Sequence, residues 1–132
     1  MDGDLVAVLF DSYHDLRTSF VFGISAAGVK YDFMITENGQ NEDASWNPNW
    51  WTKTSLTAEG WVAEMKIPFS QVRFEGSSDG VWGLEVVRYV YRNKERSFWQ
   101  HVPKDTPGMV ANFGEITGLD NIKPRKVLDI TP

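Results

Sequence analysis

The chain of 132 residues contains no cysteine, which excludes disulfide bonds and thiolate metal sites. It also has no run of the roughly 18 apolar residues that a membrane-spanning helix requires. The lysines and arginines are scattered rather than clustered, and the net charge is −5, so a nucleic-acid backbone would be an unfavourable partner. We therefore expect neither nucleic-acid binding nor membrane insertion of this segment.

The start of the chain, from Met1 to Asp4, lacks the basic segment and apolar run of a secretory leader. This leaves two alternatives, a cytosolic protein or an exported protein whose leader is not part of this chain. Aromatic residues, in contrast, are abundant at 14%, with six Trp, eight Phe and four Tyr. A single domain of this size does not need so many rings in its core, so we expect some of them to face solvent or a ligand.

Apolar side chains alternate at a spacing of two along most of the chain, which is the pattern of β-strands. Residues 4–11, 18–25 and 29–36 predict a three-stranded antiparallel meander, in which Phe20 and Phe22 share one face. Further strands are predicted at 51–56, 60–67, 81–92, 96–102, 113–119 and 126–130. The pattern predicts one domain over residues 1–132 with an all-β antiparallel sandwich, of jelly-roll or immunoglobulin-like type, and at most one short helical turn near 69–74.

Several short motifs follow one another along the chain in a fixed order. They are the apolar segment from Asp4 to Asp11, the sequence Gly-Trp-Val-Ala-Glu-Met-Lys-Ile-Pro-Phe that begins at Gly60, Trp82-Gly83, Arg88, Trp99 and Phe113-Gly114. In this set the chain resembles the family 9 carbohydrate-binding modules and their DOMON-like relatives. The resemblance is strongest to the variant on the N-terminal side of uncharacterised bacterial outer-membrane β-barrel proteins.

The resemblance has consequences for the whole protein. It implies an exported protein of the periplasm, outer membrane or extracellular space of a Gram-negative bacterium. In the family several strands precede the segment that here begins at Asp4, so the resemblance predicts that the chain is a fragment of a longer module. Exposed strand edges would then be free to pair, and a homodimer formed through strand exchange or these edges is one expected consequence.

Sugar binders combine an exposed aromatic platform with planar polar side chains, because a pyranose has a flat C–H face ringed by hydroxyls. Trp50 and Trp51 lie beside a polar loop and are the loop candidates, whereas Trp61 and Trp82 lie in strand patterns typical of a core. The resemblance adds Arg88, Trp99 and Gln100 as ligand-binding residues. The alternative for Arg88 is a partly buried ion pair with Glu64 or Glu85.

Asp11 and Asp15 stand four residues apart in a predicted turn, and the resemblance implies a structural calcium ion there. Two carboxylates fall short of the six to eight oxygens that calcium takes, so a turn capped by its own carboxylates is the competing interpretation.

Among carboxylates only Glu64 and Glu85 lie in clear strands, and nothing in the sequence sets the distance between the two carboxyl groups that a glycosidase requires. We therefore predict no catalysis.

The leading hypothesis is a non-catalytic domain that binds a polysaccharide or oligosaccharide. A second hypothesis is a structural or interaction domain of an outer-membrane protein, in which the same fold binds no sugar. A third, which follows from the DOMON-like relatives, is a b-type haem domain with Met and His ligands, for which Met34, Met65, Met109 and His101 are the candidates.

Overall fold

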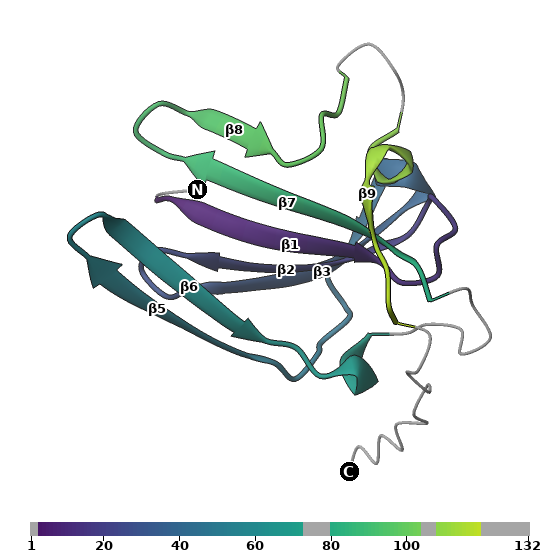
Figure 1. The fold of residues 1–132 in the computed structure, drawn as a ribbon, viewed down its shortest axis with the longest axis horizontal. Helices are drawn as coiled ribbons and strands as arrows, with labels where there is room; N and C mark the ends of the chain where they lie inside the picture. Colours follow the sequence, from purple (N-terminus) through teal and green to yellow (C-terminus); the bar gives the residue numbers. More distant parts are fainter. Residues whose placement is uncertain (1–2, 73–79, 104–107, 120–132) are drawn as a thin grey trace.

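The predicted all-β architecture is confirmed in the computed structural model, which describes residues 3–72, 80–103 and 108–119. Its strands are β1 (Leu5–Asp11), β2 (Ser19–Ser25), β3 (Lys30–Thr36), β4 (Asn41–Asp43), β5 (Trp51–Thr57), β6 (Gly60–Lys66), β7 (Trp82–Val90), β8 (Glu95–Phe98) and β9 (Gly114–Ile116). Seven of them form one antiparallel sheet in the order β4-β3-β2-β1-β7-β8, and β9 pairs with β7 beyond the end of β8. Strands β5 and β6 form a separate hairpin, which gives the molecule a sandwich-like second layer (Figure 1).

The predicted meander is confirmed as β1, β2 and β3, and the predicted hairpin as β5 and β6. A 3-10 turn at Phe69–Gln71 falls within the predicted helical turn, while the 3-10 turns at Glu37–Gly39 and Val110–Asn112 were not predicted. Strand β4 was also missed, because its three residues are polar and exposed. The strand predicted at 126–130 lies outside the described residues. Within the part of the chain that the structure describes, no helix is long and apolar enough to cross a membrane.

One face of the large sheet, called here the aromatic face, carries a core of rings. Its buried residues are Phe20, Phe22, Trp50, Val72 and Trp82. Phe22 makes edge-on contacts with both Trp46 and Trp50, at centroid distances of 5.2 Å. The segment before the hairpin is fastened to this face, since the Lys30 Nζ donates a hydrogen bond to the Trp50 carbonyl oxygen at 2.6 Å. Aromatic packing and one strand-to-loop hydrogen bond thus hold the second layer in place.

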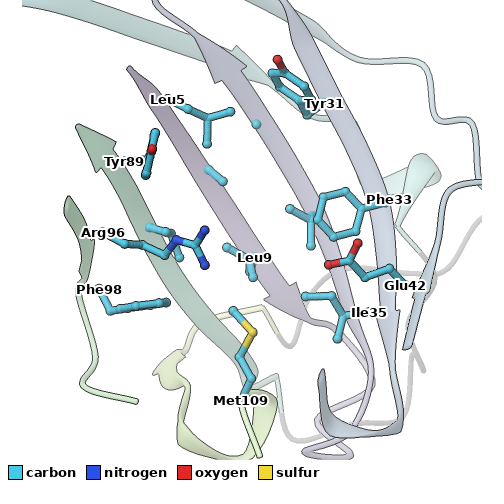
Figure 2. A pocket seen from close by; sticks show the side chains of 14 residues that line it. Leu5, Leu9, Tyr31, Phe33, Ile35, Glu42, Tyr89, Arg96, Phe98 and Met109 are labelled. Carbon is cyan, nitrogen blue, oxygen red and sulfur yellow. The ribbon is translucent and has the colours of Figure 1, made fainter. Parts of the chain in front are cut away.

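The opposite face of the sheet is apolar, and no second sheet formed by the described residues covers it. Buried Leu5, Ala7, Leu9 and Val87 lie along its centre. The 3-10 turn at Val110–Asn112 packs against one end of this face, with Val110 fully buried. The remainder is a half-open depression, called here the trough, whose side chains are drawn in Figure 2. Each strand therefore contributes alternate residues to a covered aromatic face and to the trough.

Candidate functional site

Two of the residues predicted to bind sugar lie on one face of the sheet, at the edge formed by β7 and β8. Arg88 of β7 is opposite Ser97 of β8 in the strand register. The Trp99 backbone N–H donates to the Val86 carbonyl oxygen at 2.9 Å, so the ladder continues one residue beyond β8. Because residues at even spacing share a face, Arg88, Ser97 and Trp99 lie on the same side. We call the surface formed by Arg88, Trp99 and Gln100 the Trp99 ledge.

The Trp99 indole rests against β9 at a glycine. A Cβ built on Gly114 would come within 2.5 Å of Cζ3 and 2.8 Å of Cη2 of the Trp99 ring, so a side chain there would displace the ring from this position. The bare backbone of Gly114 therefore gives the ring its place. The ring is nevertheless 54% exposed. Gly114 on β9 therefore leaves room for the exposed Trp99 ring that follows β8.

Gln100 is fixed beside Trp99 by a buried carboxylate. Its backbone N–H donates to Glu85 Oε1 at 2.8 Å, and the same oxygen accepts the Val86 N–H at 3.0 Å. Glu85 is fully buried, and its Oε2 has no hydrogen-bond partner in the described structure. The Gln100 Cγ lies within 3.0 Å of the Cβ position at Gly114, so its side chain adjoins the indole. Sequence reasoning missed this anchoring role, because Glu85 was considered only as a partner of Arg88 and as a possible catalytic carboxylate.

The predicted ion pair of Arg88 with Glu85 is wrong. Residues 85 and 88 are separated by an odd number of positions, so their side chains leave opposite faces of β7. Arg88 is exposed, whereas Glu85 is enclosed. Nor does a hydrogen bond or ion pair join the Arg88 side chain to Glu64, which is exposed on the hairpin. The Arg88 guanidinium is therefore open to solvent on the ledge.

Trp50 is not a ligand platform, which corrects the sequence-based prediction. Its side chain is only 2% exposed, and its indole Nε1 donates to Asp32 Oδ2 at 2.9 Å. Lys30 also lies 4.7 Å from the ring centroid, so a cation and a carboxylate of β3 hold this ring inside. A Trp beside a polar loop can still be core when a neighbouring strand supplies a partner for its N–H.

Trp51 is the exposed member of the pair, at 58%. It lies on the outer face of the hairpin, where the Lys66 Nζ is 5.6 Å from its ring centroid. The hairpin begins next to β3, because Trp50, which precedes it, is hydrogen-bonded to Lys30 and Asp32. In the sheet order, β2, β1 and β7 lie between β3 and β8. With about 4.8 Å between neighbouring strands, β3 and β8 are roughly 19 Å apart. Figure 1 also shows the hairpin and β8 at opposite sides of the molecule, so Trp51 and the Trp99 ledge are separate surfaces.

The turn at Asp11 to Thr18 is closed by its own carboxylates. Asp11 accepts hydrogen bonds from the backbone N–H groups of Asp15 and Leu16, at 3.2 and 2.8 Å. Asp15 accepts from the backbone of Arg17 and Thr18 and from the Thr18 hydroxyl. In the described residues no group of three or more His, Cys, Asp or Glu is arranged to hold a metal. Both carboxylates therefore cap the turn, and a calcium ion at Asp11 and Asp15 stays a prediction.

The ionisation of the two carboxyls follows from this geometry. Burial raises the pKa of Asp11 above its usual value, and the nearby Asp15 carboxylate acts in the same direction. Burial opposes ionisation of Asp15 too, but the hydrogen bonds from Arg17 and Thr18 outweigh it and lower the Asp15 pKa. A proton therefore resides on Asp11 in preference to Asp15 when the turn is acidified.

The candidate haem ligands are distributed over different parts of the fold. Met34 and Met65 pack against the aromatic core, whereas Met109 packs on the opposite face, and His101 is exposed.

Comparison with protein-family models, with curated proteins and with solved structures found no match. Function is therefore inferred from the side chains themselves. The ledge combines an exposed indole, a free guanidinium and an amide at one strand edge.

Proposed function

We propose that the chain binds carbohydrate without catalysis, as a module similar to the family 9 group, and that the Trp99 ledge is its binding surface. The observation that carries the proposal is the half-exposed Trp99 ring, held against Gly114 on the same face as Arg88. An indole held in this way presents a flat apolar platform without having to be ordered by the ligand. Only a ligand with a flat apolar face of its own gains from such a surface.

The polar groups of the ledge suit the rim of a sugar ring. The planar guanidinium of Arg88 offers several N–H donors in a fixed fork, which can engage two neighbouring hydroxyls. The Gln100 amide supplies both a donor and an acceptor, as hydroxyl groups require. The net charge of −5 adds a preference for a neutral ligand over an anionic polymer. The family resemblance further supports an exported protein that meets polysaccharide outside the cytoplasm.

A titration with soluble oligosaccharides tests the proposal. Binding of glucan, xylan and chitin fragments would be measured by isothermal titration calorimetry on the intact chain and on Trp99→Ala and Arg88→Gln. We expect Trp99→Ala to weaken binding about tenfold or more, because a stacked ring of this kind contributes on the order of 1.4 kcal/mol. Trp51→Ala is the matched control, since Trp51 is equally exposed on a separate surface.

If Trp51→Ala abolishes binding and Trp99→Ala leaves it unchanged, the ledge is not the site. If no oligosaccharide or insoluble polysaccharide binds the folded chain, carbohydrate binding itself is refuted.

The exposed hairpin supports a second function, that of an interaction domain in an outer-membrane protein. Leu56, close to the hairpin turn, is 86% exposed, and Val62 on β6 is also exposed. Exposed aliphatic side chains on a projecting arm are typical of a surface that a partner covers. This alternative predicts an intact fold that gives no heat with any sugar.

A further inference from the structure

The trough is shaped by the order of side-chain sizes across the sheet. In the register of β3, β2, β1, β7 and β8, one row of neighbours runs Tyr31, Gly23, Ala7, Val87 and Phe98. The smallest residues stand at the centre of this row and aromatic rings stand at both ends. The difference in size leaves a depression with a volume of about 340 Å³. A cavity of this volume is within the range of small-molecule sites.

The floor of the trough is apolar and rigid. Ala7 and Gly23 are buried and directly opposite each other in the sheet. A Cβ built on Gly23 would lie 3.4 Å from the Ala7 Cβ, which is ordinary contact, so the site tolerates a side chain and the depth of the trough depends on its absence. Central strands of a sheet hold such a floor in a fixed shape.

Four polar side chains line the trough. Arg96 of β8 is directly opposite Tyr89 of β7 in the register, and Tyr31 stands on the far wall. Glu42 reaches in from β4 at the other side, and Figure 2 shows its carboxylate and the Arg96 guanidinium turned toward the trough from opposite walls. No hydrogen bond or ion pair joins these four side chains to any residue of the described ranges. An apolar depression thus has a positive group at one end and a negative group at the other, and neither has a partner among the described residues.

We propose that the trough binds a small amphipathic monoanion, with a hydrocarbon body on the floor at Ala7 and Gly23 and a carboxylate beside Arg96. The guanidinium offers the bidentate geometry that a carboxylate takes. Tyr89, opposite Arg96 in the register, lines the same trough. Glu42 repels a second negative charge at the opposite wall, which sets the orientation of the ligand. This site is independent of the proposed sugar site, because the two lie on opposite faces of the sheet.

Two other occupants fit the trough less well. A sugar would place hydroxyl groups over aliphatic carbons and leave them without hydrogen bonds, which is costly. A second copy of the chain, packed face to face, would set one depression against another and enclose empty space between them. A flexible hydrocarbon chain fills a narrow apolar depression without either penalty.

The test uses three ligands of equal chain length, decanoate, decanol and decylammonium. The two ions are kept below their micelle concentrations, and decanol is kept below its solubility. Calorimetry on the intact chain should show decanoate binding about fivefold or more tightly than decanol, because the charge-assisted bond to an exposed guanidinium adds a modest increment. Decanoate should also bind more tightly than decylammonium, because an ammonium makes no bidentate contact with Glu42 of the kind that Arg96 makes with a carboxylate. Arg96→Gln should remove the preference for decanoate over decanol. Glu42→Gln should tighten decanoate and weaken decylammonium. Gly23→Val should prevent binding of all three ligands.

Controls separate this site from the sugar site and from self-association. Trp99→Ala should leave decanoate binding unchanged, so the two proposals fail independently. If Gly23→Val does not fold, the comparison of the three ligands on Arg96→Gln still decides. Equal affinities for the three ligands, or no binding of any, would overturn the proposal. Sedimentation equilibrium that shows a dimer dissociated by Gly23→Val would assign the trough to a second copy instead and would also overturn it.

Discussion

Gly83 and Gly114 both lie in crowded places, yet alanine should have very different effects at the two positions. A Cβ on Gly83 would lie 2.7 Å from the Asp11 Cβ and 3.5 Å from the Phe113 Cβ. Gly83 and Asp11 are direct neighbours in the β7–β1 register, and Asp11 is fully buried. A Cβ atom cannot rotate away from its own backbone, so the two strands would have to separate at this point.

The cost of Gly83→Ala can be worked out from these contacts. Overpacking in a filled interior costs about 1–3 kcal/mol. Displacement of Asp11 would also weaken the hydrogen bonds that its carboxylate accepts from Asp15 and Leu16, at about 1 kcal/mol. The smaller conformational entropy of alanine in the unfolded chain returns roughly 0.4–1 kcal/mol. We therefore expect a loss of about 2 kcal/mol in the free energy of unfolding.

At Gly114 the atoms in the way are the outer edge of the half-exposed Trp99 ring and the Gln100 Cγ at 3.0 Å, and both belong to side chains that can shift outward. Gly114→Ala should therefore cost less than about 1 kcal/mol. Urea unfolding followed by far-UV circular dichroism measures both variants. With a urea slope of about 1.5 kcal/mol/M, Gly83→Ala should lower the midpoint by about 1.3 M. An unchanged midpoint for Gly83→Ala, or an equal loss for Gly114→Ala, would refute the reasoning.

Further predictions concern the aromatic core and the acidic turn. Trp50→Phe should lower the free energy of unfolding by about 1–3 kcal/mol, because it leaves the Asp32 carboxylate without its indole partner. Trp51→Phe should change this free energy by no more than about 0.5 kcal/mol in the same urea titration. The lowered pKa of Asp15 stabilises the fold above the unfolded value of 3.8, and this stabilisation is lost as the pH falls through 3.8 toward the folded value. Asp15→Asn should therefore lower the free energy of unfolding at pH 7 by less than about 1 kcal/mol, because Asp15 is exposed and screened by solvent. The difference in this free energy between the variant and the natural chain should shrink at pH 3.

Local sequence was sufficient for the longer strands, since each carries its own period-two pattern. Phe20 and Phe22 share one face of β2 as predicted, although all seven residues of this strand are buried, and the exposed and half-buried residues of β6 alternate as predicted. Strand β4 could not be predicted in this way. Its three residues are polar and exposed and carry no period-two pattern. They form a strand only because the chain turns back at Glu37–Gly39 and pairs them with the end of β3.

The candidate site was harder to predict for the same reason. Trp50 and Trp51 are adjacent in the sequence, and only the partners that β3 supplies, Lys30 and Asp32, decide which ring is enclosed. The trough was not predicted at all, because its floor exists only where the register sets Ala7 opposite Gly23. Arg88 and Trp99 were found through the family resemblance, whereas their common face became visible only through the β7–β8 register.

The two proposed sites share strands β7 and β8, so their independence can itself be measured. Arg88 and Arg96 belong to neighbouring strands but leave opposite faces, because Arg88 is opposite Ser97 and Arg96 is opposite Tyr89. Substitutions without shared partners act additively. The double variant Arg88→Gln, Arg96→Gln should therefore bind sugar as weakly as Arg88→Gln alone, and decanoate as weakly as Arg96→Gln alone, in calorimetric titrations of the four proteins. If the double variant is weaker than the corresponding single variant for either ligand, the sheet transmits an effect from one face to the other, and the assignment of one ligand to each face would be wrong.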